Sequence, residues 1–169
     1  AGLSTHPGIA SVSVVGSAAT GRAVMRQAAD TLKHVSLELG GKNALVMFPD
    51  ADVEKAVQSA VKGMNLPWTA GQSCGSTSRV FVHESLYDTV VDQLAAAFDA
   101  VKPGDPLSPG TEMGCLSTRG QYDKVRGYIE IAQNEGARMV AGGDVPEELS
   151  HGFFVRPTVF ADVTPDMHI

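Results

Sequence analysis

The sequence has 169 residues, 43% of them hydrophobic, and a mean hydropathy of zero, which is typical of a globular protein long enough to bury a core. Its formal net charge is −6, and its 13 lysines and arginines are scattered, so no basic stripe is available to follow a phosphate backbone. The acidic balance argues against docking on an anionic membrane, and no apolar run is long enough for a transmembrane helix. We therefore expect neither a nucleic acid nor a membrane as a partner.

The two cysteines, Cys74 and Cys115, are too few for a disulfide framework. They predict thiols in a reducing compartment, which we take to be the cytoplasm. The N-terminus lacks the basic and apolar regions of a secretory signal and has no initiator methionine, so we expect the chain to begin inside a longer protein. The histidines show no spacing typical of a metal site, and we predict no bound metal.

Apolar strands are expected to alternate with amphipathic helices along the chain. The strands are predicted at 12–15, 35–39, 44–48, 79–83, 138–141 and 153–160, the last interrupted by Pro157. The helices are predicted at 22–33, 53–64, 85–101 and 118–134, with a proline- and glycine-rich loop at 103–110. This order predicts an α/β fold with a largely parallel sheet, in which ligands gather at the carboxyl ends of the strands.

A glycine loop, GSAATG at 16–21, follows the first predicted strand. It almost fits the phosphate-binding pattern G-x-x-x-x-G-K-[ST], but Arg22 stands where lysine is required and Ala23 where a hydroxyl must hold magnesium. A helix N-terminus after such a turn still directs N–H groups toward an anion such as a pyrophosphate. The alternative is a plain strand-to-helix turn, which the loop by itself favours.

The segment GQSCGSTSR, residues 71–79, places Cys74 among glycine and hydroxyl residues. Structural cysteines usually pack in apolar surroundings, as we expect for Cys115 within MGCL. The N–H groups of a glycine loop can stabilise a thiolate, and also the oxyanion formed after its attack, which makes Cys74 a candidate nucleophile. A surface linker with an incidental cysteine is the alternative, and the loop alone does not choose between the two.

Glu38 lies between Leu37 and Leu39, near the end of the second predicted strand. Because side chains alternate along a strand, its carboxylate is expected on the face shared by Ser36 and Gly40, away from the two leucines. A carboxylate at the end of a half-buried strand suits a general base. The alternative is an exposed strand-end glutamate without a catalytic role.

Four motifs occur in one order and at close spacing: V-S-V-V-G-S at 12–17, L-E-L-G-G-K at 37–42, G-Q-S-C at 71–74 and F-V-R-P-T-V-F at 154–160. In this combination the sequence resembles the NAD(P)-dependent aldehyde dehydrogenase superfamily over essentially the whole chain. The resemblance implies an α/β fold in which residues 1–40 are the end of a Rossmann-like cofactor-binding domain. Residues 41–169 would then be the start of a doubly wound catalytic domain.

The resemblance also implies a reaction. Cys74 would attack an aldehyde substrate to form a thiohemiacetal, which loses hydride to NAD or NADP and becomes a thioester. Glu38 would activate the water that hydrolyses this thioester to a carboxylic acid, and its presence argues against a coenzyme A-acylating relative. The oxyanion would be held by the Cys74 N–H and by an asparagine that lies outside this sequence.

Five positions match cofactor-binding positions of the family: Gly16, Ser17, Gly21, Leu39 and Gln121. The first three belong to the turn beside the pyrophosphate, the fourth lies near the nicotinamide, and the last can touch a ribose, as can Lys124. Three positions depart from the family pattern. Thr69 stands where asparagine is frequent, Ser76 where alanine is frequent and Cys115 where proline is frequent. Either of the first two could reshape the pocket wall without removing the chemistry.

The sequence lacks several parts that the resemblance implies, including the oxyanion asparagine, the ribose-binding lysine and the hairpin through which relatives form homo-oligomers. We therefore expect an internal fragment with little activity of its own. Two other functions stay open. A thiol acyltransferase or hydrolase would need a histidine beside Cys74, and His83 is the nearest in sequence. A non-catalytic nucleotide-binding remnant would retain some affinity for NAD.

Overall fold

The computed structural model describes residues 2–169. The chain divides into two compact units, Ala1–Asn43 (unit 1) and Ala44–Ile169 (unit 2). The division falls close to the predicted boundary after residue 40. That the two units belong to a cofactor-binding and a catalytic domain stays a prediction.

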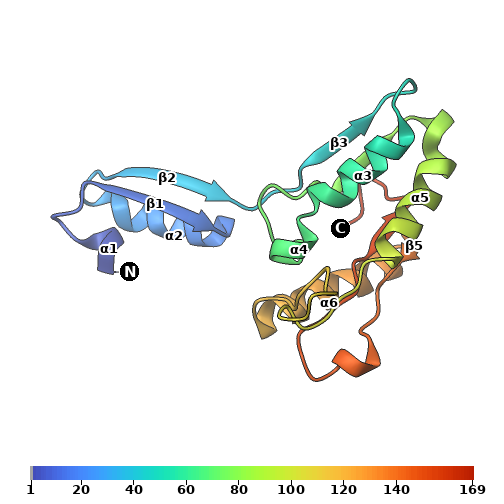
Figure 1. The fold of residues 1–169 in the computed structure, drawn as a ribbon. Coiled ribbons are helices and arrows are strands. Elements are labelled where there is room, and N and C mark those ends of the chain that lie inside the picture. The colour runs from blue at the N-terminus through green and yellow to red at the C-terminus, as the bar shows by residue number, and fades with distance from the viewer. Residues whose placement is uncertain (1) are drawn as a thin grey trace. The chain divides into compact units, whose positions relative to one another are not determined.

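Unit 1 holds a parallel pair of strands packed against a helix (Figure 1). Its elements in chain order are α1 (Gly2–Thr5), β1 (Ser11–Gly16), α2 (Ala18–Ala29) and β2 (His34–Leu39). Exposed and half-buried residues alternate along both strands, as the sequence of β2 predicted. Glu38 therefore lies on the exposed face of the pair, beside Val15 in the register, while Leu37 and Leu39 lie on the face toward α2.

Helix α2 begins and ends about one turn earlier than the predicted helix at 22–33. Ser17 explains the early start, because its Oγ accepts the Thr20 N–H at 3.1 Å and caps the helix. Leu32, which was predicted on the apolar face of this helix, lies beyond its end with a φ of 51° and is 92% exposed.

A buried lysine holds the connection from α2 to β2. Lys33 is 8% exposed, and its ammonium group donates to the carbonyls of His6 and Ile9 at 2.5 and 2.6 Å. These bonds satisfy the buried charge. They also tie the start of β2 to the segment before β1, which fixes where the strand that carries Glu38 begins.

Unit 2 contains two further pairs of strands and the two longest helices (Figure 1). Its first elements are β3 (Ala44–Met47), α3 (Val53–Gly63), α4 (Leu66–Thr69), β4 (Arg79–Val82), η1 (Glu84–Leu86) and α5 (Tyr87–Asp99). Its later elements are α6 (Arg119–Asn134), β5 (Arg138–Ala141), η2 (Glu147–Leu149) and β6 (Val159–Ala161). Strands β3 and β4 are parallel, whereas β5 and β6 are antiparallel, so the expectation of parallel pairing fails for the last pair.

The strand predicted at 153–160 is mostly irregular, and only its end forms β6. Pro157 has no N–H for a strand ladder, which shortens the strand. Phe154 and Val155 are instead buried by packing, and the Phe153 carbonyl accepts the Leu116 N–H at 2.8 Å. The segment is therefore part of the core without being a strand.

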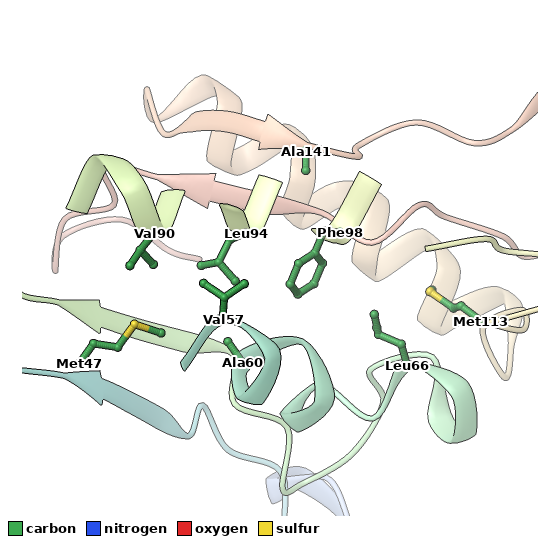
Figure 2. Packing of buried hydrophobic residues seen from close by; sticks show 9 residues of the cluster. All are labelled: Met47, Val57, Ala60, Leu66, Val90, Leu94, Phe98, Met113 and Ala141. Atoms are coloured by element: carbon green, nitrogen blue, oxygen red, sulfur yellow. The ribbon is translucent and has the colours of Figure 1, made fainter. Parts of the chain in front are cut away.

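The core of unit 2 lies between α5 and the elements α3 and β3 (Figure 2). Val90, Leu94 and Phe98 recur every four residues on one face of α5, as the sequence spacing predicted, and none is more than 8% exposed. The other buried members of the cluster are Met47, Val57, Ala60, Leu66, Met113 and Ala141. None of the helices within residues 2–169 combines the length and the apolar character that crossing a bilayer requires.

Candidate functional site

The first group of predicted site residues lies where β1 and β2 end side by side. The register pairs Gly16 with Leu39, and the Gly40 N–H donates to the Gly16 carbonyl at 3.2 Å. Ser17 follows immediately as the N-cap of α2, so strand and helix are joined by one residue. The first N–H groups of α2 consequently emerge at the carboxyl edge of the strand pair, where they can hold an anionic group.

Gly21 allows α2 to approach β2 closely. A Cβ at this position would lie 2.9 and 3.0 Å from the two δ-carbons of Leu39 and 3.4 Å from a δ-carbon of Leu37. A larger side chain would therefore push the helix away from the strand and move its N-terminus from the strand ends. The structure brings Gly16, Gly21 and Leu39 together with the N-cap serine, and their contact with a cofactor stays a prediction.

Cys74 lies on an exposed turn between α4 and β4. The Ser76 N–H donates to the Ser73 carbonyl at 3.1 Å, which closes a four-residue turn with Cys74 and Gly75 at its centre. The Gly75 N–H also donates to the Ser73 Oγ at 3.1 Å. The thiol is thus carried by a hydrogen-bonded turn, which argues against an irregular surface linker.

Ser76 anchors the far side of this turn. The residue is 5% exposed, and its Oγ lies 3.1 Å from the carbonyl oxygens of both Met64 and Gly71. Its side chain therefore points into the protein, and the expectation that it shapes a pocket wall stays a prediction. Thr69, the other predicted wall residue, donates its hydroxyl to the Asn65 carbonyl at 3.1 Å within α4.

The same turn rests on the end of α3. The Thr77 N–H donates to the Gly63 carbonyl at 3.1 Å, and the Thr77 hydroxyl donates to the Ala60 carbonyl at 3.4 Å. A Cβ at Gly63 would lie 2.3 Å from the Thr77 Oγ1. The close approach of these two segments therefore requires glycine at the last position of α3.

Gln121 lies in the first turn of α6, where its N–H donates to the Oγ1 of the N-cap Thr118 at 3.1 Å. The Lys124 ammonium lies 5.9 Å from the centre of the Tyr128 ring, in cation–π contact. Glu38 belongs to unit 1 and Cys74 to unit 2, so the meeting of these two side chains stays a prediction.

Cys115 is exposed, which contradicts its expected packing among apolar neighbours. Its neighbours Met113 and Leu116 are 4% and 3% exposed and take the buried positions of this segment instead. Exposure alone therefore does not distinguish Cys74 from Cys115, and the distinction comes from the turn. Within residues 2–169, no group of three or more histidine, cysteine, aspartate and glutamate side chains is arranged to hold a metal ion.

Residues 1–169 match the model of the Aldehyde dehydrogenase family. The chain belongs to this family. Aldehyde dehydrogenase tropH of Talaromyces stipitatus is 49% identical over 173 residues, which cover 99% of this chain and 33% of the relative. Betaine aldehyde dehydrogenase of Brucella anthropi is 44% identical over 171 residues, which cover 100% of this chain and 35% of the relative.

A solved structure shows the same similarity. The NAD+ complex of aldehyde dehydrogenase from Bacillus cereus superposes with a TM-score of 0.91 and 45% identity over 98% of this chain and 33% of the other. The family resemblance and the α/β fold class predicted from the motifs are confirmed. The chain spans about a third of the length of the curated relatives it matches.

In this aldehyde dehydrogenase chain, sequence reasoning missed the hydrogen bonds of Gln72. Its Oε1 accepts the N–H and the hydroxyl of Ser117 at 3.1 and 2.9 Å, and its Nε2 donates to the Thr69 carbonyl at 2.9 Å. Gln72 belongs to the G-Q-S-C motif, so its position beside the candidate nucleophile could have indicated a role in the site. Nothing in the sequence around Ser117 indicated this partner.

Proposed function

We propose that the protein containing this chain oxidises an aldehyde to a carboxylic acid with NAD or NADP, and that Cys74 and Glu38 carry the chemistry. The observation that supports this most directly is the exposed, hydrogen-bonded turn that presents Cys74 within a chain of this family. The proposal extends to a cytoplasmic location, consistent with two cysteines that are both thiols.

In the proposed reaction the Cys74 thiolate attacks the aldehyde carbon, and the carbonyl electron pair moves to oxygen as the carbon–sulfur bond forms. The oxyanion re-forms a carbonyl when hydride leaves the carbon, which produces a thioester on Cys74. Glu38 then takes a proton from water, whose oxygen attacks the thioester. The carbon–sulfur bond breaks, the acid is released and the thiolate returns.

The end of the β1–β2 pair fits a dinucleotide cofactor. The one-residue connection at Ser17 leaves the N–H groups of α2 at the strand edge, and Gly21 keeps the helix close to Leu39. We propose that Gly16, Ser17, Gly21 and Leu39 hold the cofactor. Gln121 would lie near a ribose. When bound, the nicotinamide accepts the hydride.

Two observations weigh against His83 as the base that a thiol acyltransferase or hydrolase would need beside Cys74. His83 follows the C-terminal end of β4, whereas Cys74 precedes its N-terminal end, and a strand of this length spans roughly 13 Å. The His83 Nδ1 also lies 2.9 Å from the Ser85 Oγ and accepts the Ser85 N–H. A Cys–His pair needs direct hydrogen-bond contact, and the contacts of His83 with Ser85 do not favour such a pair with Cys74.

Substitution of the two proposed catalytic residues tests this function in the protein as its gene encodes it. Cys74→Ser is expected to abolish aldehyde-dependent reduction of NAD(P), and Glu38→Gln to lower the steady-state rate about 100- to 10,000-fold, the range for loss of a general base. Cys115→Ser, an equally exposed thiol, serves as the matched control and should retain activity. Full activity of Cys74→Ser would contradict the proposal.

A further inference from the structure

The Gln72 side chain links the turn that carries Cys74 to the segment before α6. Gln72 lies two positions before Cys74 and is partly buried. Its amide oxygen accepts two hydrogen bonds from Ser117, and its amide nitrogen donates to the carbonyl of Thr69 at the end of α4. A single side chain therefore joins α4, the turn and a segment 45 residues away along the chain.

Cys74 is held from both sides. Ser76 anchors the turn two positions after it through the carbonyls of Met64 and Gly71, and Gln72 anchors the turn two positions before it. A nucleophile has to be placed within about 0.5 Å of its productive position, and a displacement of about 1 Å can lower a rate about 100-fold. The placement of the sulfur thus depends on these two anchors.

We propose that Gln72 and Ser117 are positioning residues that hold the sulfur of Cys74 in place for attack, an inference that rests on the proposed function. Gln72 acts as acceptor and donor at once, so an apolar residue of similar size loses both contacts. Ser117 contributes its N–H and its hydroxyl, and Ser117→Ala removes only the hydroxyl. Because Ser117 is exposed, this change creates no cavity and its structural cost is small.

Steady-state kinetics of the protein as its gene encodes it tests the role. Ser117→Ala is expected to lower kcat about three- to tenfold, the size of one neutral hydrogen bond, with the KM values for aldehyde and NAD(P) unchanged. Ser117→Thr keeps the hydroxyl and should retain the wild-type kcat. Gln72→Leu should lower kcat about 30- to 100-fold. Ser108→Ala and Gln58→Leu, the same changes on exposed residues outside the site, should leave kcat unchanged.

A second measurement needs neither aldehyde nor cofactor. The rate of Cys74 alkylation by iodoacetamide, followed by peptide mass, should differ at least about threefold between wild type and both Ser117→Ala and Gln72→Leu. Wild-type kcat and wild-type alkylation in both variants would overturn the positioning role. If Cys74→Ala retains aldehyde oxidation, the proposed function fails, and the alkylation rates alone then decide whether Gln72 and Ser117 position the thiol.

Discussion

Gly63→Ala is expected to destabilise unit 2 and to displace the turn that carries Cys74. A Cβ at Gly63 would lie 2.3 Å from the Oγ1 of Thr77, 3.1 Å from its Cγ2 and 3.3 Å from its Cβ. Rotation of the Thr77 side chain does not relieve the last of these contacts. The Thr77 backbone therefore has to shift to relieve it. This shift strains the 3.1 Å hydrogen bond from the Thr77 N–H to the Gly63 carbonyl.

Two opposing contributions set the size of this effect. Alanine is more stable than glycine within a helix by about 0.5–1 kcal/mol, whereas overpacking costs about 1–3 kcal/mol. Because Gly63 is the last residue of α3, we expect the gain in helix stability from alanine to be smaller there than in the middle of the helix. We therefore expect the free energy of unfolding to fall by about 1–2 kcal/mol, since overpacking dominates.

Urea unfolding followed by far-ultraviolet circular dichroism measures this change. Gly127→Ala in α6 is the matched control, because a Cβ there would meet no atom within 4 Å, and it should stabilise by about 0.5–1 kcal/mol. Adding Thr77→Ala to Gly63→Ala removes the two shorter contacts, those with Oγ1 and Cγ2, and should give a coupling energy of about 1 kcal/mol in a double-mutant cycle. A Gly63→Ala protein as stable as the Gly127→Ala control would show that a Cβ at position 63 does not overpack against Thr77.

Three further substitutions test other parts of the fold. Ser17→Ala removes the N-cap of α2 and should lower the stability of unit 1 by about 1 kcal/mol in urea unfolding, while Ser17→Asn should restore it. Gly142→Ala should cost about 2 kcal/mol or more, because φ is 70° and the new Cβ would lie 2.0 Å from the Pro157 carbonyl oxygen; an unchanged midpoint would contradict this. A hydrogen bond from Arg138 lowers the pKa of Asp162 in the folded protein. The contribution of this ion pair to the free energy of unfolding is therefore complete above the unfolded pKa of about 3.9, and it is lost as the pH falls through the lower pKa of the folded state. Asp162→Asn should therefore lose less stability than wild type below about pH 4.

Elements with a strong period were predictable from the sequence. The spacing of Val90, Leu94 and Phe98 predicted the buried face of α5, because tertiary packing and helical period agree there. The alternation around Glu38 predicted its exposed face for the same reason. The motif containing Cys74 predicted a polar loop, and the structure adds the hydrogen bonds that order it.

Features set by contacts distant in sequence were not predictable. The four-residue spacing of Val24, Ala28 and Leu32 predicted a helix through Leu32. That spacing did not indicate that α2 ends at Ala29, before Leu32 is reached. The contact of Gln72 with Ser117 joins residues 45 positions apart, and no local pattern in either segment signals it. Cys115 looked buried because its neighbours are apolar, but only those neighbours turn inward.

Mass spectrometry of a stalled intermediate tests directly whether Cys74 is the nucleophile and Glu38 the base for hydrolysis. In Glu38→Gln protein mixed with aldehyde and NAD(P), attack by Cys74 and loss of hydride should still proceed, whereas hydrolysis of the thioester should be slow. We expect a burst of about one reduced nicotinamide per site and an acyl group on the peptide that contains Cys74. An unmodified Cys74 together with wild-type turnover, or an acyl group on a different residue, would contradict it.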